Sequence, residues 1–167
     1  MKLLLISIMW IFPAFSQVNL VRISKSIEIK RPIQEVFEHV KNTLNDDTWR
    51  TEVNTMEADG PFMIGTTYTE DAHIGLQTNF ITKTTLISLI ENKLAFYQTP
   101  ENAKYFLSSL REVESLNDQK TKFTYTVEFD YEMSKETLRI KLPKEVLEFS
   151  YGLIMSQYLK NLKEYLD

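Results

Sequence analysis

The chain changes its hydrophobic period within residues 27–37, which read Ile-Glu-Ile-Lys-Arg-Pro-Ile-Gln-Glu-Val-Phe. From Val21 to Lys30, apolar and polar side chains mostly alternate, which is typical of a half-buried strand. From Pro32, apolar residues recur at steps of three and four as far as Leu44, which is typical of an amphipathic helix. Proline suits the first position of a helix, because its missing N–H would be unpaired there in any case. The sequence therefore predicts a strand that leads directly into a helix.

A second short helix is predicted at residues 48–53, with Trp49 on it, because Asn45, Asp46 and Asp47 are residue types that cap helix N-termini. We interpret the two aspartates as caps that complement the helix dipole, not as a catalytic carboxylate pair. After the turn at 59–61, β-branched and aromatic residues dominate. Strands are predicted there at 65–69, 78–90, 94–98, 105–116 and 123–133. Their short connections predict an antiparallel sheet with one covered face.

The last predicted strand has the clearest alternation, and its apolar face carries Phe123, Tyr125, Val127, Phe129, Tyr131 and Met133. After Pro143, a wide apolar stripe predicts one long helix over 144–167. The fold class is therefore α+β, with two short helices after the first strand, about seven strands and a long C-terminal helix that covers the sheet. Gly152 lies inside that helix, where we expect a ligand tail, a close-packed strand or a tolerated irregularity.

The composition describes one globular domain: 167 residues, 43% hydrophobic and 12% aromatic. A net charge of −4 provides no basic surface for phosphates, so no nucleic-acid partner is predicted. The absence of cysteine excludes disulfides, thiolate metal sites and a cysteine nucleophile. No nucleotide-binding glycine loop, zinc-protease motif or serine-hydrolase motif is present, so neither a catalytic motif nor a cofactor is predicted.

In the order and spacing of several segments, the chain resembles the START-like, Bet v 1-like superfamily, whose members include SRPBCC and polyketide cyclase/dehydrase-type proteins. The segments are 27–37, Trp49, Gly60-Pro61, Gly65-Thr66, 93–96, 121–125 and 159–164. The resemblance implies a helix-grip fold, in which a curved antiparallel sheet wraps around the C-terminal helix and leaves a cavity between them. Relatives use that cavity for sterols, lipids, polyketides, plant hormones and quinones, and include both carriers and enzymes, so the fold does not set the function.

We predict that the cavity binds a small hydrophobic molecule, lipid-, quinone- or polyketide-like, without catalysis. Its predicted lining residues are Tyr68, Phe80, Leu86, Phe96, Arg111, Tyr125, Phe129, Tyr131, Tyr151, Met155 and Tyr158. Arg111 faces inward if Glu112 and Glu114 face solvent, and a buried arginine needs an anion. That anion is either a ligand carboxylate or a carboxylate of the chain itself.

Two alternative functions use the same fold. A polyketide cyclase or dehydratase would need an inward acid–base pair, for which Glu70 is the candidate because it shares strand parity with Tyr68. An envelope interaction module would have a filled interior. The Asp71 and His73 side chains would point together on a strand, but two ligands make an incomplete metal site, so no metal is predicted. His39 is predicted to lie on the surface.

The N-terminal residues have the layout of a secretory signal: Lys2, a largely apolar run of ten residues over 3–12, and the helix-breaking Pro13. Crossing a bilayer takes about 20 residues, so no stable membrane span is predicted. Ala14 and Ser16 suit a signal peptidase that cuts before Gln17. We therefore predict a signal peptide over 1–16, a START-like domain over 17–167 and a secreted or periplasmic protein. The alternative is an apolar N-terminal strand that stays in the fold.

Overall fold

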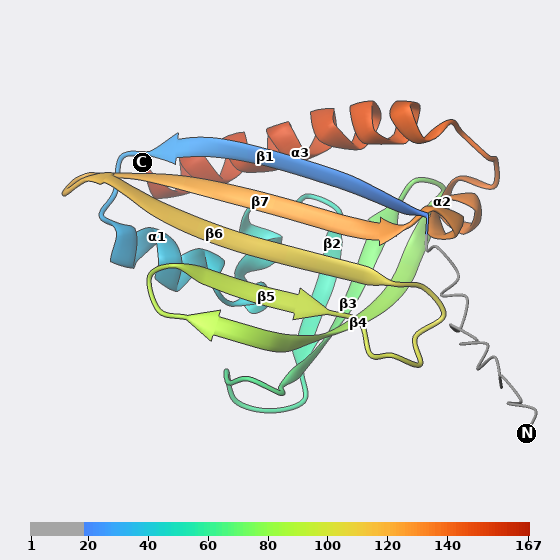
Figure 1. The fold of residues 1–167 in the computed structure, drawn as a ribbon, viewed down its shortest axis with the longest axis horizontal. Helices are drawn as coiled ribbons and strands as arrows, with labels where there is room; N and C mark the ends of the chain where they lie inside the picture. The colour runs from blue at the N-terminus through green and yellow to red at the C-terminus, as the bar shows by residue number, and fades with distance from the viewer. Residues whose placement is uncertain (1–18) are drawn as a thin grey trace, which may run out of the picture.

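The computed structural model describes residues 19–167 (Figure 1). The predicted signal peptide over 1–16 and the alternative N-terminal strand lie outside the described residues. The elements follow in the order β1 (Leu20–Ile29), α1 (Ile33–Val40), the 3₁₀ helix η1 (Thr43–Thr48), β2 (Val53–Ala58), β3 (Thr67–Ile74), β4 (Gln77–Ile90), β5 (Leu94–Gln98), β6 (Leu107–Asn117), β7 (Lys120–Asp130), α2 (Tyr131–Leu138) and α3 (Lys144–Leu166).

All seven strands form one antiparallel sheet, in the order β1-β7-β6-β5-β4-β3-β2. The sheet is curved, and the long helix α3 lies along one of its faces (Figure 1). The predicted α+β fold class is therefore confirmed. None of the helices within residues 19–167 is both long enough and apolar enough to cross a membrane.

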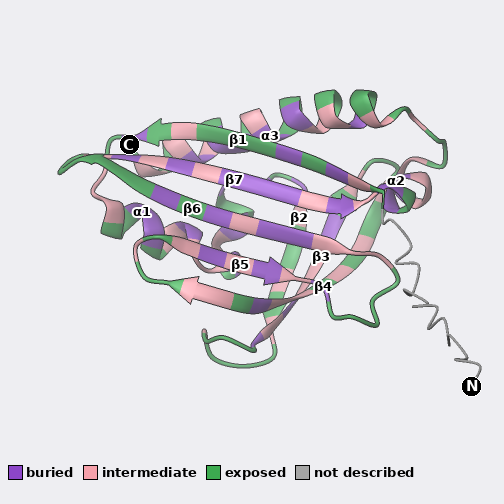
Figure 2. Ribbon diagram, in the orientation of Figure 1, coloured by how far each residue is buried: buried purple, intermediate pink, exposed green. Residues whose placement is uncertain are grey.

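The core lies between the sheet and the helices, because the inward side chains of β1, β6 and β7 pack against α1 and α3. Figure 2 shows buried and intermediate positions along β7, and buried positions that give way to exposed ones toward the end of β6. The largest cluster includes Val21, Phe37, Trp49, Phe123 and Leu162. A smaller cluster consists of Tyr68, Leu86, Ala95 and Tyr97. On β6, Arg111 and Val113 face inward and are buried, as predicted.

The last strand ends earlier than predicted. β7 stops at Asp130, whose side chain accepts a hydrogen bond from the Glu132 N–H and so caps α2. Tyr131 and Met133 therefore lie on a helix, and their assignment to the strand was wrong. Both remain buried, because the helix turns them back toward the core.

The predicted helix over 48–53 was also misplaced. Asn42 caps a 3₁₀ helix five residues earlier, since its side chain accepts a hydrogen bond from the Leu44 N–H at 3.1 Å. Trp49 is the residue that ends this helix, and Val53 already belongs to β2, a strand that the sequence analysis did not predict. The first helix accordingly ends at Val40 and does not reach Leu44.

Two further expectations are decided by contacts. Gly152 packs against the Lys25 side chain of β1, and a Cβ at this position would lie 3.1 Å from Lys25 Cε. Of the three expectations, the contact with β1 is the one that the structure shows, and it is made by the far end of the Lys25 side chain. His39 is half-buried and is not a free surface residue: its ring stacks on Tyr165, with ring centroids 4.9 Å apart, and Nε2 lies 2.9 Å from Thr48 Oγ1.

Candidate functional site

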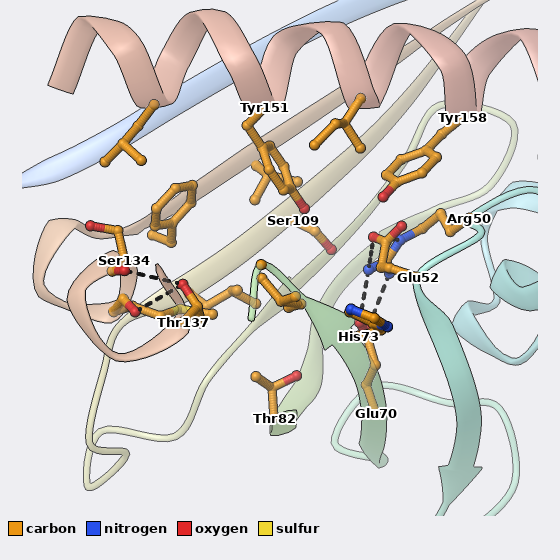
Figure 3. A pocket seen from close by; sticks show the side chains of 18 of the residues that line it. Arg50, Glu52, Glu70, His73, Thr82, Ser109, Ser134, Thr137, Tyr151 and Tyr158 are labelled. Carbon is orange, nitrogen blue, oxygen red and sulfur yellow. Dashed lines mark hydrogen bonds and ion pairs between the residues drawn. The ribbon is translucent and has the colours of Figure 1, made fainter. Parts of the chain in front are cut away.

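A cavity of about 170 Å³ lies between α3 and the sheet (Figure 3). Much of its wall is apolar, formed by Ile74, Leu107, Val127, Phe129, Met133, Leu138, Leu147 and Ile154. Four lining residues are exposed and mark where the cavity opens to solvent: His73, Gly75, Ser150 and Ile154. The cavity contradicts the hypothesis of an interaction module with a filled interior.

One end of the cavity carries an ion-pair cluster centred on Arg50 (Figure 3). Arg50 donates to Glu52 Oε1 from Nε at 3.0 Å and from Nη2 at 2.7 Å. It also holds both oxygens of Glu70, from Nη1 at 3.0 Å and Nη2 at 2.8 Å, and donates to Asp46 from Nη1 at 2.9 Å. Burial alone would lower the pKa of Arg50, but the surrounding carboxylates, Glu70 first, hold it above its ordinary value.

Arg111 forms the deeper half of this cluster. It donates to Asp46 from Nη1 at 2.8 Å and Nη2 at 2.6 Å, and to the Val40 carbonyl oxygen at 2.9 Å. Both partners are buried, Arg111 with 1% and Asp46 with 0% of its surface exposed. The chain therefore supplies the anion that Arg111 needs, and the interpretation of Asp46 as a helix cap was wrong.

The charges of this cluster do not cancel. Two guanidinium groups, Arg50 and Arg111, face the three carboxylates of Asp46, Glu52 and Glu70. One carboxylate oxygen, Glu52 Oε2, is buried and has no hydrogen-bond partner within residues 19–167. The polar end of the cavity is therefore negative and contains an unused acceptor.

Three tyrosine side chains complete this end of the cavity. Burial raises the pKa values of Tyr125, Tyr151 and Tyr158, and the Glu52 charge raises those of Tyr151 and Tyr158 further. Their hydroxyl groups therefore stay protonated at neutral pH. Tyr151 and Tyr158 extend from α3 into the cavity, and the Tyr158 hydroxyl points toward Glu52 (Figure 3).

The structure places the predicted lining residues in two groups. The residues that line the cavity are Arg111, Tyr125, Phe129, Tyr151 and Tyr158. The other predicted residues lie outside this cavity, each for a local reason.

Tyr68 and Leu86 are buried in the smaller core cluster, and Met155 is fully buried in the main core under α3. Phe80 lines a neighbouring groove between β4, the 99–105 connection and α2. Tyr131 begins α2 and donates its hydroxyl hydrogen to the Leu142 carbonyl oxygen. Phe96 lies on the opposite face of β5, because Ala95 and Tyr97 take the buried parity.

The side chains of Asp71 and His73 do not point together as expected. β3 has an irregular register between Ala72 and Ile74, which shifts His73 to the cavity with Glu70. Asp71 instead accepts hydrogen bonds from Asn79 at 2.9 Å and Asn54 at 3.3 Å. Within residues 19–167, no three His, Asp or Glu side chains are grouped so that they could hold a metal ion.

No family model and no curated protein sequence matches the chain. Solved structures do match. A START superfamily protein from Mycobacterium smegmatis superposes with a TM-score of 0.70 at 13% identity, covering 87% of this chain and 96% of that one. The chain has a START-like, Bet v 1-like fold. A protein from Thermobifida fusca gives a TM-score of 0.63 at 20% identity, covering 87% and 93% of the two chains.

The di-domain ARO/CYC BexL from the BE-7585A biosynthetic pathway also has this START-like fold, with a TM-score of 0.61 at 10% identity. The alignment covers 89% of this chain and 50% of BexL, so the chain spans half of that protein. At these identities the comparisons establish the helix-grip fold and leave the ligand open.

Within this START-like fold, sequence reasoning missed Arg50 and Glu52. Both residues fall within the helix predicted over 48–53, and positions two apart on a helix point to different sides, so they were not expected to act together. One signal was present: Arg50 and Glu52 are two positions apart just before a strand, and residues at this spacing lie on the same side of an extended chain. The lining hydroxyl groups of Thr82, Ser109, Ser134 and Thr137 carry no such signal.

Proposed function

We propose that this protein binds a small hydrophobic molecule in the cavity between the sheet and α3, without catalysing a reaction. The observation that carries the proposal is the cavity itself, with an apolar wall along most of its length and a polar cluster at one end. Burial of the ligand's apolar surface would stabilise the complex by about 25 cal/mol per Å². The polar end would fix the orientation of the ligand.

The volume restricts the size of the ligand. The cavity of about 170 Å³ is close to an engineered protein cavity of about 150 Å³ that binds benzene. A ring or a short chain therefore fits inside. A longer lipid-, quinone- or polyketide-like molecule would leave its remainder in the opening at Ser150 and Ile154.

Native mass spectrometry of the protein purified from its host without detergent tests this proposal. We expect a bound species that organic extraction removes. Ser150→Phe would narrow the opening and should abolish the bound species, whereas Gln157→Phe, on an exposed part of α3 outside the cavity, should keep it. A host-purified protein without a bound species, which also fails to bind added 2-phenylethanol, would contradict the proposal.

A polyketide cyclase or dehydratase that uses the same cavity is the second candidate, because two carboxylates, Glu52 and Glu70, lie at the cavity. Arg50 occupies both oxygens of Glu70, so Glu52 Oε2 is the oxygen left to accept a proton. Incubation with a linear poly-β-ketone distinguishes the two candidates. A cyclised or dehydrated product that forms faster than without protein, and is lost in Glu52→Gln, would establish the enzyme.

We also propose that residues 1–16 are an export signal, cleaved between Ser16 and Gln17, and that the protein functions in the periplasm or outside the cell. The support is the order of Lys2, the apolar run, Pro13 and the small residues Ala14 and Ser16. Intact mass and N-terminal sequencing of protein from the native host test it. Gln17 should be the first residue, and a mass that includes residues 1–16 would overturn the proposal.

A further inference from the structure

We propose that the cavity prefers ligands whose polar end is a protonated amine, and that Glu52 accepts the hydrogen bond from that amine. This inference rests on the proposed binding function and specifies the chemistry of the ligand. It starts from the unpaired Glu52 Oε2, because a buried acceptor without a partner costs free energy that a ligand donor can recover.

Glu52 is positioned as a ligand contact. Only 8% of its surface is exposed, and the side chain lines the cavity. Oε1 is held by Arg50 through two hydrogen bonds of 3.0 and 2.7 Å, which fix the carboxylate in place. Oε2 has no partner among residues 19–167.

The chain has no spare donor in Arg50 to satisfy this oxygen. A guanidinium group has five N–H bonds, and Arg50 makes five hydrogen bonds to Asp46, Glu52 and Glu70. Arg50 could reach Oε2 only by giving up one of them. The protein donor nearest in direction is the Tyr158 hydroxyl, which points toward Glu52 but makes no hydrogen bond to Oε2, so the oxygen stays available to a bound molecule.

The charge of the cluster indicates a cation. Asp46, Glu52 and Glu70 bring three negative charges against the two positive charges of Arg50 and Arg111. An ammonium group would balance the cluster, and charge-assisted hydrogen bonds are stronger than neutral ones. The nearby Tyr151 and Tyr158 rings, which line the cavity, add surfaces that attract cations.

A ligand carboxylate fits this end poorly. The Arg111 Nη groups already donate to Asp46 and the Val40 carbonyl oxygen, which leaves Nε as its unpaired nitrogen. That guanidinium lies among the rings of Trp49, Tyr97 and Tyr125, within 5.9 Å of each ring centroid. An anion placed there would also meet the excess negative charge of the cluster.

Calorimetric titration of the full chain at pH 7 tests the inference with three probes that share a phenyl ring: 2-phenylethylamine, 2-phenylethanol and 3-phenylpropionate. The amine should bind at least tenfold more tightly than the alcohol, and the carboxylate should bind most weakly. Glu52→Gln should weaken amine binding about tenfold and leave alcohol binding within about twofold, since it removes a charge and keeps the ring contacts. Glu57→Gln, the same change at an exposed position of β2, should alter neither.

The outcomes separate this inference from the proposed function. If the three probes bind equally, or if the carboxylate binds best, the amine preference is overturned while hydrophobic binding stands. This comparison uses the unmodified protein, so it decides the question even if Glu52→Gln fails to fold. Tyr158→Phe should keep the preference for the amine. If it removes the preference as Glu52→Gln does, the Tyr158 hydroxyl is the recognising group and the assignment to Glu52 is wrong.

Discussion

Asp46 is fully buried and accepts hydrogen bonds from two arginines, Arg50 and Arg111. Asp46→Asn removes the charge that both guanidinium groups face, and leaves them buried with less compensation. Because breaking a buried ion pair costs about 3–5 kcal/mol, we expect the free energy of unfolding to fall by about that amount. Urea denaturation of the variant against the parent protein measures this difference.

The exposed pair Arg22–Glu128 serves as the control, because the Arg22 side chain is 62% exposed. Arg22→Ala should change the free energy of unfolding by less than about 1 kcal/mol, as is usual for surface pairs. Equal effects of Asp46→Asn and Arg22→Ala would mean that the buried cluster contributes no more than a surface pair.

His39 gives the protein a dependence of stability on pH near neutrality. Burial lowers the pKa of this imidazole below its ordinary value of 6.5. The unfolded chain therefore binds a proton at His39 more readily than the folded chain does. The contribution of His39 to the free energy of unfolding is complete above pH 6.5, and it is lost as the pH falls below that value. The melting temperature should fall between pH 7.5 and 5.5, and the fall should be smaller in His39→Gln. Identical falls in both proteins would refute this role.

Gly152 is the position of α3 with the lowest helix propensity among its interior residues. Alanine is more favourable than glycine within a helix by about 0.5–1 kcal/mol. A new Cβ would lie 3.1 Å from Lys25 Cε, but Lys25 is an exposed, flexible side chain that can shift. We therefore expect Gly152→Ala to raise the free energy of unfolding by up to that amount in urea denaturation. A destabilised variant would show that β1 cannot move away from α3.

Gly75 should respond in the opposite direction. It forms the turn between β3 and β4 at a φ of +62°, and a Cβ would lie 2.7 Å from both the Thr137 carbonyl oxygen and Leu138 Cδ2. Gly75→Ala should destabilise the protein by about 1–3 kcal/mol, because backbone strain and a clash with α2 add together. Since Gly75 also lines the cavity, ligand binding measured by native mass spectrometry should weaken as well. Unchanged stability would contradict the tight packing of this turn on α2.

The elements that the sequence predicted are those whose period changes sharply. Pro32 marks the change from strand to helix. In β6, the alternation with the charged Glu112 and Glu114 correctly predicted that Arg111 faces inward. The helix α2 was not predicted, because Tyr131 and Met133 continue the alternation of β7 after the strand has ended. The hydrophobic period does not change at Asp130, so it gives no sign that this residue caps a helix.

The site depends on contacts between parts of the chain that are distant in sequence. Arg111 and Asp46 are 65 positions apart, and Arg50 and Glu70 are 20 apart. The sequence predicted that Arg111 needs an anion, but only the fold determines which carboxylate reaches it. The same holds for Phe96, because the pairing of β5 with β6 sets which of its faces is buried.

Trp49 connects the cavity to the folding of the whole protein. Its ring lies edge-on to Tyr125, with centroids 5.4 Å apart, and Tyr125 lines the cavity. The chain has two tryptophans, and Trp10 lies in the proposed export signal, so Trp10→Phe makes Trp49 the sole reporter in the full chain as well. Its emission should shift when a cavity ligand binds and again when the protein unfolds.

A ligand that binds only the folded state stabilises it by about 2.7 kcal/mol at a concentration 100 times its dissociation constant. For a chain of this length, that corresponds to a rise in melting temperature of about 5–10 °C, followed by Trp49 emission. We expect this rise in Trp10→Phe with whichever phenyl probe binds most tightly. Adding Ser150→Phe should remove the rise at the same probe concentration, because the ligand can no longer enter. A rise that survives Ser150→Phe would place the stabilising ligand outside the cavity.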